Sequence, residues 1–299
     1  MTQPEAGTYC GFINPEDPCS PQPDGYGPVP SPDTADAFLA DPELHAFAQK
    51  APATVPSTGN TVYKQVFRDL NAATSAQSYL GLRTLESYDV QTCAAFCDCN
   101  ELCTAFNIFV ERDPSLNPST NASTAPTVWG RDCPNPPSMT TFKCTLWGSS
   151  IDASTATNKG ETREQFQVVI TGSDGYDRTD VATPPAPQPN PPKPPKNCGN
   201  KGQDAPKYCI GKHFFPGPYN PHACYDYALS LNVANKNAGF GQQCSYFNAY
   251  YLFKNGKPHG TYCNLYNSEI DIGFATYTGG VSGGDKYECK QSWGFSIAI

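Results

Sequence analysis

The chain has 299 residues, a formal charge of −8, a pI near 5.0, 14 cysteines and 4 histidines. Such an acidic surface argues against nucleic acid and anionic lipid as partners, and no apolar run reaches the length of a membrane span. Many cysteines, few histidines and no paired CxxC spacing favour disulfide bonds over a metal site or a cofactor. We therefore expect a secreted, extracellular protein.

Residues 1–60 form a proline-rich N-terminal region. The chain begins without the basic and apolar stretches of a signal peptide, so we expect that a leader has been removed and that Met1 was added. The segment DTADAFLADPELHAFAQKA (33–51) predicts one amphipathic helix, capped by Asp33 or Thr34. We expect this helix to pack on the domain that follows.

Two parts of the chain, residues 61–178 and 198–299, resemble each other in sequence. The longest match runs without a gap, and shorter matches precede it in the same order, which is a strong repeat signal. The matches are CTLWGSSIDASTATNKG (144–160) with CNLYNSEIDIGFATYTG (263–279), CTAFNIF (103–109) with CSYFNAY (244–250), and a tyrosine five residues before a cysteine (Tyr88 and Cys93, Tyr219 and Cys224). We expect two domains of one design.

Each domain is expected to hold a short helix and an antiparallel sheet. The helix carries Cys93 or Cys224, and the strand after it alternates apolar and polar residues. In the second domain, Asn-Gly within KNGK (254–257) predicts a tight hairpin turn. In the first domain a long loop, residues 112–141, replaces this turn and carries a glycosylation sequon at Asn121.

Residues 179–197 are expected to link the two domains. Eight prolines fall between Pro184 and Pro195. Because proline lacks an N–H and fixes φ, this stretch cannot join a helix or the interior of a sheet. It predicts a stiff polyproline II spacer roughly 35 Å long and, in consequence, domains that fold independently.

The repeat suggests how the cysteines pair. The helical Cys93 and Cys97 are expected to reach the sheet, and Cys99 and Cys133, which lack counterparts in the second domain, are expected to anchor the long loop to the helix. The expected pairs are Cys10–Cys19, Cys93–Cys144, Cys97–Cys103, Cys99–Cys133 and Cys224–Cys263. The remaining four allow three pairings, of which we prefer Cys198–Cys289 and Cys209–Cys244. Each bridge contributes about 2–4 kcal/mol by restricting the unfolded chain.

A helix tied to a sheet by cysteines in the order C-x3-C, C-x-x-F-N and C-x-L-[WY] resembles the PAN/apple family. The chain is similar to the tandem modules of secreted filamentous-fungal proteins, also through its segments 10–47 and 111–119. The resemblance implies an α+β fold of two disulfide-stapled modules, each a short helix packed on an antiparallel sheet, joined by a polyproline linker. It also implies binding of proteins or carbohydrates without catalysis. The second module departs from the pattern, because Ala228 replaces its second helical cysteine.

The sequence contains no recognisable catalytic or metal-binding spacing. GxSxG, HExxH, P-loop and GxGxxG motifs are missing, and the histidines are scattered. Glu111 and Asp113 are interpreted as solvated carboxylates of the long loop rather than as an acid/base pair. Asp174, Asp177 and Asp180 lie three residues apart but lack the ligand density of a calcium loop.

Polar residues that both domains share are interpreted as scaffold. Asn107 and Asn248 each follow a phenylalanine and predict a buried asparagine that bonds the backbone. Asp152 and Asp271 are expected to cap turns. Residues kept by two divergent domains support the fold more plausibly than a ligand site.

A ligand is expected to contact exposed aromatic side chains, because Tyr and Trp stack on sugar rings and anchor interfaces. The candidates are Tyr246, Tyr250, Tyr266 and Tyr277 in the second domain and Trp129 in the long loop of the first. The alternative is that these tyrosines are half-buried cover for the sheet.

The sequence thus predicts a non-catalytic extracellular binding or adhesion protein that recognises a glycan or an extracellular protein. Two modules on one chain would raise avidity for a repetitive target such as cell-wall glycan. A structural surface or matrix protein that self-associates is the alternative, since the chain is proline-rich and carries few charges. A secreted hydrolase is a third hypothesis, for which we find no residues.

Overall fold

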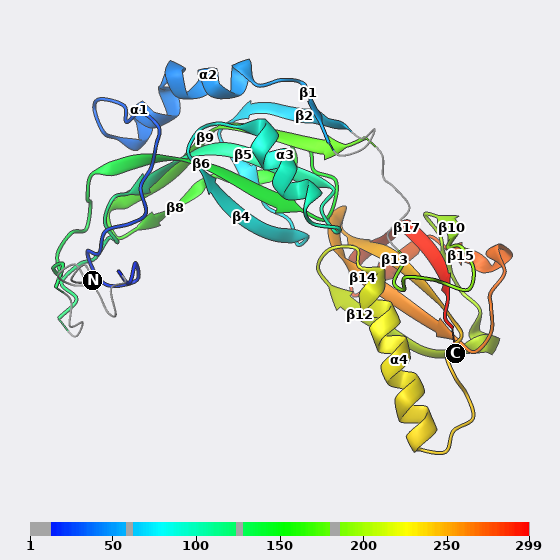
Figure 1. Cartoon of the computed structure of the whole chain (residues 1–299). Coiled ribbons are helices and arrows are strands. Elements are labelled where there is room, and N and C mark those ends of the chain that lie inside the picture. Colours follow the sequence, from blue (N-terminus) through cyan, green and yellow to red (C-terminus); the bar gives the residue numbers. More distant parts are fainter. Residues whose placement is uncertain (1–12, 58–61, 124–127, 180–185, 299) are drawn as a thin grey trace, which may run out of the picture.

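The computed structural model describes residues 13–57, 62–123, 128–179 and 186–298. Within these ranges the chain is α+β, with four α-helices and antiparallel sheets, as the sequence predicts. Two large sheets, of seven and six strands, form two separate bodies in Figure 1. We call them the first sheet and the second sheet, and each has a small two-stranded ribbon beside it.

The N-terminal region forms two helices instead of the single helix expected. α1 (Ala35–Ala40) and α2 (Pro42–Lys50) are separated at Asp41, because Pro42 lacks an N–H and disfavours helical geometry in the residue before it. Asp41 then caps α2 by accepting a hydrogen bond from the N–H of Glu43 at 2.8 Å. Both helices lie along one face of the first sheet (Figure 1). Their buried side chains are Phe38, Leu44 and Ala48.

The first sheet has the strand order β1-β2-β9-β5-β6-β4, and β8 pairs with β9. Its strands are β1 (Thr54–Pro56), β2 (Val62–Leu70), β4 (Tyr79–Leu85), β5 (Ala105–Pro114), β6 (Ser138–Trp147), β8 (Gly160–Arg163) and β9 (Phe166–Arg178). The helix α3 (Val90–Asp98) packs on β5 and β6. The ribbon consists of β3 (Ala73–Thr74) and β7 (Ala156–Asn158).

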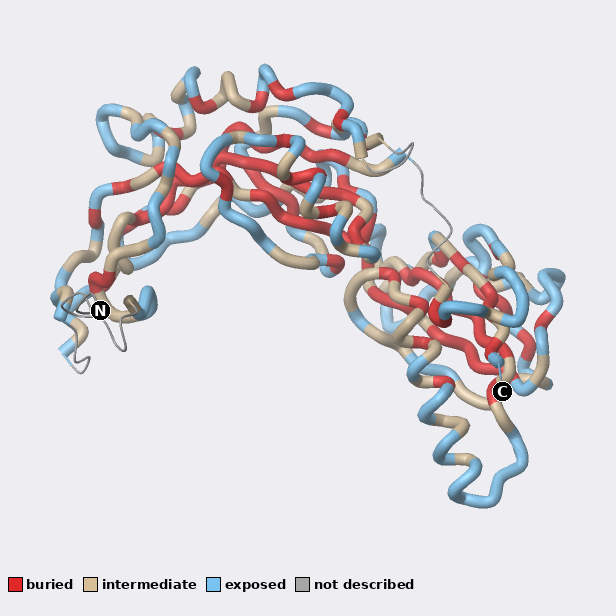
Figure 2. Tube along the Cα trace, in the orientation of Figure 1, coloured by how far each residue is buried: buried red, intermediate tan, exposed pale blue. Residues whose placement is uncertain are grey.

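The two faces of the first sheet differ because successive side chains of a strand point to opposite faces. On β5, Phe106, Ile108 and Val110 join the hydrophobic core beneath α1, α2 and α3. Figure 2 shows these central strands as the most buried part of this body. The alternate residues of β5 and β6 therefore point to the face away from these three helices, and that face bears the candidate site.

The second sheet has the strand order β10-β17-β13-β14-β12, and β16 pairs with β17. Its strands are β10 (Lys196–Gly199), β12 (Cys209–Pro216), β13 (Tyr246–Lys254), β14 (Lys257–Tyr266), β16 (Gly279–Ser282) and β17 (Asp285–Ser296). The helix α4 (Pro221–Asn237) packs on β13 and β14. The ribbon consists of β11 (Gly202–Gln203) and β15 (Ala275–Tyr277), and two 3-10 turns span Pro206–Tyr208 and Ile272–Phe274.

The predicted hairpin turn is confirmed. Strands β13 and β14 pair up to Lys254 and Lys257, so only Asn255 and Gly256 remain in the loop. Both residues have positive φ, 51° and 78°. A two-residue loop with two positive φ angles matches the twist of the flanking strands, and Asn-Gly adopts it at low cost.

A buried asparagine holds the ribbon against each sheet. The side-chain oxygen of Asn107 accepts a hydrogen bond from the N–H of Thr74 at 2.7 Å, and its nitrogen donates to the hydroxyl of Ser173 at 2.9 Å. Asn248 repeats this pattern in the second sheet. Its partners are the N–H of Gln203 at 2.8 Å, the hydroxyl of Ser292 at 2.9 Å and the carbonyl of Trp293 at 3.0 Å. The scaffold interpretation of both residues is confirmed.

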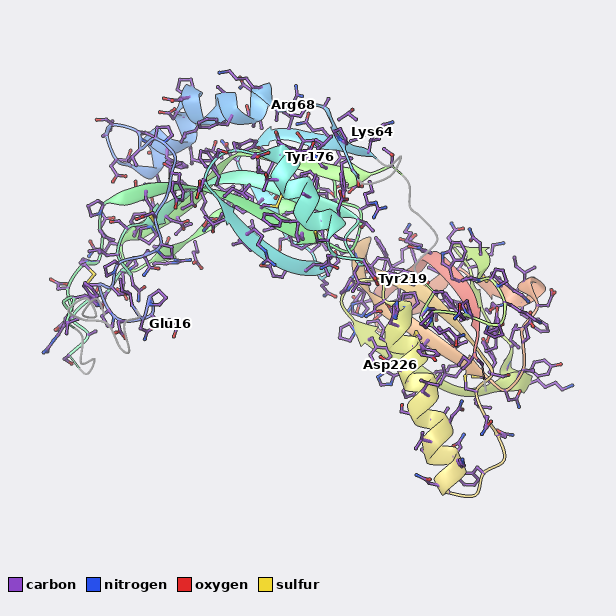
Figure 3. All side chains as sticks on the ribbon, in the orientation of Figure 1. Glu16, Lys64, Arg68, Tyr176, Tyr219 and Asp226 are labelled. Atoms are coloured by element: carbon purple, nitrogen blue, oxygen red, sulfur yellow. A yellow bond between two sulfur atoms is a disulfide. The ribbon has the colours of Figure 1, made fainter. Side chains whose placement is uncertain are left out.

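Other shared residues also have matching roles. Tyr88 donates a hydrogen bond to a carbonyl of β5 at 3.2 Å, and Tyr219, labelled near α4 in Figure 3, donates to a carbonyl of β13 at 2.9 Å. Asp152 and Asp271 each accept a hydrogen bond from the N–H two residues further on, at 2.7 and 2.8 Å, and so cap turns as expected. The sequence repeat therefore corresponds to repeated hydrogen bonds.

The described residues contain four disulfide bonds: Cys19–Cys133, Cys93–Cys144, Cys97–Cys103 and Cys224–Cys263. The last three were expected and are confirmed. The expected Cys10–Cys19 and Cys99–Cys133 pairs are wrong, because Cys19 bonds Cys133 and ties the N-terminal region to the long loop. Cys10 lies outside the described residues, and Cys99 is an exposed free thiol.

The preferred pairs Cys198–Cys289 and Cys209–Cys244 are also wrong, because all four cysteines are free thiols. The two thiols of each preferred pair are nevertheless neighbours. Burial, and to a smaller extent the nearby Cys198, raise the pKa of Cys289, and burial and the nearby Cys209 raise that of Cys244.

The described part of the proline-rich segment, from residue 186 onward, lies against the second sheet. Pro187 and Gln188 are buried, and the amide of Gln188 donates to the carbonyl of Ser296 at 2.7 Å. Lys193 forms an ion pair with Glu269. These contacts anchor the segment at Gln188 and Lys193, while Pro189, Asn190, Pro192 and Pro194 remain exposed.

The two sheets also touch directly. Gly148 follows β6 and lies against Pro218, so closely that a Cβ at position 148 would fall 2.4 Å from the Cβ of Pro218. His259 of β14 contacts the side-chain oxygen of Gln77, with Nδ1 at 3.1 Å. Tyr251 of β13 is buried at the same junction, beside the hydroxyl of Ser149.

Candidate functional site

A cleft of about 520 Å³ lies on the face of the first sheet away from α1, α2 and α3. Its floor comes from β5 and β6, which contribute Phe109, Glu111, Lys143, Thr145 and Trp147. One wall comes from β3, β4 and the segment that joins them, with Thr74, Ser75, Ala76, Tyr79 and Leu82. The other wall comes from β7, β8 and β9, with Asn158, Gly160, Glu161, Arg163 and Val168.

The floor carries a buried ionic cluster of three side chains, which we call the Lys143 cluster: Glu111, Asp113 and Lys143. The ammonium of Lys143 contacts the carboxylate of Glu111 and that of Asp113, the latter at 2.6 Å. Asp113 also accepts a hydrogen bond from the hydroxyl of Thr141 at 2.6 Å. Strand alternation explains the cluster, because odd-numbered residues of β5 and β6 share this face.

The two carboxyl groups differ in proton affinity. Burial and the nearby charge of Asp113 raise the pKa of Glu111 to about 7, although Lys143 acts in the opposite direction. Burial would also raise the pKa of Asp113, but Lys143 and the other hydrogen bonds outweigh it and hold that pKa below its usual value. Burial lowers the pKa of Lys143, yet the two carboxylates more than compensate and raise it. Lys143 is therefore charged, and Glu111 takes up a proton near neutral pH.

The expectation that Glu111 and Asp113 are solvated loop residues is wrong. Both lie in β5, every residue of which is buried, and they are only 8% and 6% exposed. β5 and β6 extend to Pro114 and from Ser138, so the loop between them is shorter than predicted. The sequence did contain a signal for this arrangement. Glu111 and Asp113 occupy alternate positions of one strand and Lys143 lies in the next, a pattern that indicates a polar face of a sheet.

Aromatic and hydroxyl groups complete the cleft. The register of β4 on β6 places Tyr79 opposite Trp147, with ring centroids 5.5 Å apart and edge to face. Trp147 is buried and donates from its ring N–H to Thr145 at 3.1 Å, whereas Tyr79 is 51% exposed. The hydroxyl of Thr74 is buried in the wall, and no described residue offers it a hydrogen-bond partner. The cleft thus combines an accessible ring, charged groups and an unsatisfied hydroxyl.

The tyrosines predicted as ligand contacts are not surface residues. Tyr246, Tyr250 and Tyr266 are 0%, 5% and 1% exposed, and Tyr277 is half-buried. The β11–β15 ribbon covers them, because Gln203 accepts hydrogen bonds from the hydroxyls of Tyr246 and Tyr266 at 3.0 and 2.6 Å. The alternative interpretation, that these tyrosines cover the sheet, is the one that agrees with their burial.

The same face of the second sheet lacks the ionic cluster. In the sequence repeat Leu252 corresponds to Glu111, and Tyr262 corresponds to Lys143. Leu252 is buried, and Tyr262 stacks on Tyr250 with centroids 5.1 Å apart. Packed rings fill the position where the first sheet has charged groups and a cleft.

Trp129, the remaining predicted contact, lies in the long loop and not in the cleft. It is half-buried, and it lies near the Cys19–Cys133 bridge, since a Cβ added at the adjacent Gly130 would fall 3.8 Å from the Cβ of Cys19. Asn121, the sequon asparagine, is exposed and has a positive φ of 44°. An asparagine tolerates this conformation better than most residues.

A second polar cluster joins α2 to the first sheet but does not have the geometry of a catalytic triad. The Nδ1 of His45 lies 2.5 Å from a carboxylate oxygen of Asp69, and its Nε2 lies 2.9 Å from the carbonyl of Leu39. Because both partners are acceptors, this geometry favours the protonated imidazole, in which both ring nitrogens donate. The nearby hydroxyl of Thr171 donates to Asn71 at 2.8 Å, so His45 is not its base.

Asp174 is a buried structural carboxylate, and Asp177 is a half-buried one. Asp174 accepts a hydrogen bond from the N–H of Asp69 at 2.9 Å, and Asp177 accepts one from the N–H of Ile151 at 2.9 Å. Burial raises their pKa values to about 7 and about 6. Asp180 lies outside the described residues. Across the part of the chain that is described, no group of three His, Cys, Asp or Glu side chains has a metal-binding arrangement.

Comparison with known proteins adds no family: no protein-family model and no curated protein matches this chain. Among the described residues, none of the helices has the length and apolar character needed to cross a membrane.

Proposed function

We propose that this chain is a secreted, non-catalytic binding protein with two PAN/apple-like modules, and that the cleft of the first sheet recognises carbohydrate. The observation that carries this proposal is the pairing of the accessible Tyr79 ring with the buried Lys143 cluster in one cleft. Sugar rings stack on aromatic faces through their C–H groups, and their hydroxyls need donors and acceptors together. Disulfide bonds in the described residues agree with an oxidising compartment.

The arrangement of the carboxylates supports binding rather than hydrolysis. A glycosidase places two carboxyl groups on opposite sides of the scissile bond, one to donate a proton and one to act as nucleophile or base. Here Glu111 and Asp113 hold the same ammonium group, and Asp113 does not line the cleft. A substrate in the cleft would meet only one of them.

The test is calorimetric titration of neutral oligosaccharides against the unmodified protein and the variant Tyr79→Ala. Loss of one stacking contact of about 1 kcal/mol should weaken binding about fivefold. Tyr26→Ala is the matched control, because Tyr26 is similarly exposed at 56% and does not line the cleft. Equal affinities of all three proteins would show that the cleft is not the site, and a failure of every glycan to bind would refute carbohydrate recognition.

Self-association is a second candidate function, favoured by the outer half of α4. This half projects away from the second sheet in Figures 1 and 2. It exposes Leu229, Val233 and, just beyond the helix, Phe240, at 37%, 61% and 66%. If these side chains mediate assembly, light scattering should show a mass that grows with concentration, and Val233→Ser should abolish the growth. A constant monomer mass over the whole concentration range would exclude this function.

A further inference from the structure

The charges around the cleft do not balance. Three carboxylates (Glu111, Asp113, Glu161) and two cations (Lys143, Arg163) lie in the cleft or directly behind its floor, which leaves one negative charge in excess. Glu161 and Arg163 form an exposed pair at 2.6 Å on the rim and neutralise each other. The excess therefore belongs to the buried Lys143 cluster.

Within this cluster, the negative charge that faces the ligand is that of Glu111. Asp113 already accepts hydrogen bonds from Thr141 and Lys143 and lies behind the floor. Glu111 lines the cleft, and burial together with Asp113 raises its pKa to about 7. A carboxylate with a raised pKa is one whose charge the protein solvates poorly, so an added cation would stabilise it.

We infer that the cleft binds the ammonium group of an amino sugar, with Glu111 as its counter-ion and the exposed ring of Tyr79 beside the sugar. This inference rests on the proposed carbohydrate binding and specifies the class of sugar. The ammonium would restore charge neutrality and donate charge-assisted hydrogen bonds to Glu111. The negative face of an aromatic ring adds attraction for a cation.

The hydroxyl of Thr74 independently points to a bound polar molecule. Thr74 is only 4% exposed and lines the cleft, and its hydroxyl oxygen has no partner among the described residues. A buried hydroxyl without a hydrogen bond costs about 1–3 kcal/mol, so such groups are normally satisfied by water or ligand. A sugar hydroxyl would supply the missing partner.

Other charge types fit the cleft less well. An anionic sugar such as a uronic acid would need a free cation, but Lys143 is already shared by two carboxylates and Arg163 is paired with Glu161. A neutral or N-acetylated sugar would supply no counter-ion for Glu111, so Glu111 would stay protonated or keep a poorly solvated charge, and its carboxylate would add little to binding. The quantity to measure is therefore the ratio of the binding affinities for amino sugars and for their N-acetylated forms.

The experiment titrates glucosamine oligomers, N-acetylglucosamine oligomers and glucuronic acid oligomers into the full chain. We expect glucosamine oligomers to bind about tenfold more tightly than the acetylated ones, and uronic acid oligomers to bind weakest. Glu111→Gln should abolish the tenfold preference. The matched control Glu86→Gln, at an exposed position that does not line the cleft, should retain it, and melting temperatures verify that both variants are folded.

A second measurement needs no variant. Below about pH 7 the cation must displace the proton of Glu111, so binding should release protons. Calorimetry in two buffers of different ionisation enthalpy detects this release. Equal binding of glucosamine and N-acetylglucosamine oligomers, or no proton release, would overturn the ammonium inference while leaving carbohydrate binding intact. If no sugar binds at all, the proposed function fails as well.

Discussion

Asn107 and Asn248 use their side-chain amides to bond segments that are distant in the chain. Each accepts a hydrogen bond from a ribbon strand and donates to the last long strand of its sheet. Both side chains are fully buried. A buried amide of this kind replaces the backbone pairing that the short ribbons cannot provide by themselves.

We predict that Asn107→Ala lowers the free energy of unfolding by about 3 kcal/mol, because it leaves the N–H of Thr74 and the hydroxyl of Ser173 without partners. Chemical denaturation measures this change. Asn237→Ala, at an exposed position of α4, is the control and should change stability by less than about 0.5 kcal/mol. Similar effects of the two substitutions would mean that Asn107 is not a structural support.

At the scale of elements, α2 is held on the first sheet by packing and by one charged pair. Leu44 and Ala48 of α2 are buried against the sheet. The next residue after Leu44, His45, bonds the carboxylate of Asp69 in β2. Burial lowers the pKa of His45, but hydrogen bonds to Leu39 and Asp69 outweigh it, and the pKa is raised above its usual value of 6.5. The charged form is therefore the one that the folded protein stabilises.

This direction of shift fixes the pH dependence of α2. A group with a raised folded pKa stabilises fully below its unfolded pKa of about 6.5, and the contribution is lost as the pH rises through the folded value. We predict that amide-exchange protection factors in α2 fall a few-fold across this range. His45→Asn should remove the dependence, while His213→Asn, at an exposed site, should not. Protection of α2 that does not vary with pH in the unmodified protein would contradict the prediction.

At the scale of the whole molecule, the two sheets meet through a small junction. Gly148 packs on Pro218, Gln77 contacts His259, and Tyr251 is buried beside Ser149. The proline-rich segment led us to expect two domains that fold independently. These junction contacts matter for that prediction, because separated domains would lose them. A buried tyrosine at the junction would be exposed if the two bodies separated.

We predict that Gly148→Ala loosens the junction, because the added Cβ would lie 2.4 Å from Pro218 and 3.1 Å from the carbonyl of Leu102. Overpacking of this kind costs about 1–3 kcal/mol. Small-angle scattering should report a larger radius of gyration for this variant. Gly241→Ala has open space around its Cβ and should leave the radius unchanged. An unaltered radius for Gly148→Ala would show that the junction tolerates the extra atom.

Local sequence determined the features that depend on neighbouring residues. Asn-Gly at 255–256 predicted the hairpin, because its backbone preference is intrinsic. The repeat predicted the matching asparagines and the bridges Cys93–Cys144 and Cys224–Cys263, because equal spacing on equal elements brings the same side chains together. In the N-terminal region the amphipathic pattern predicted helix, but it did not predict the break that Pro42 imposes.

Tertiary structure alone decided the features that depend on which strands become neighbours. Sequence order cannot reveal that the N-terminal Cys19 reaches Cys133, or that Cys209 and Cys244 remain free thiols. The burial of the candidate tyrosines follows from a ribbon that pairs residues more than 70 positions apart. The cleft likewise exists only because β4, β5, β6 and β8 surround Glu111 and Lys143. Strand alternation places these two side chains on one face of the sheet, but only the pairing of β5 with β6 brings them into contact.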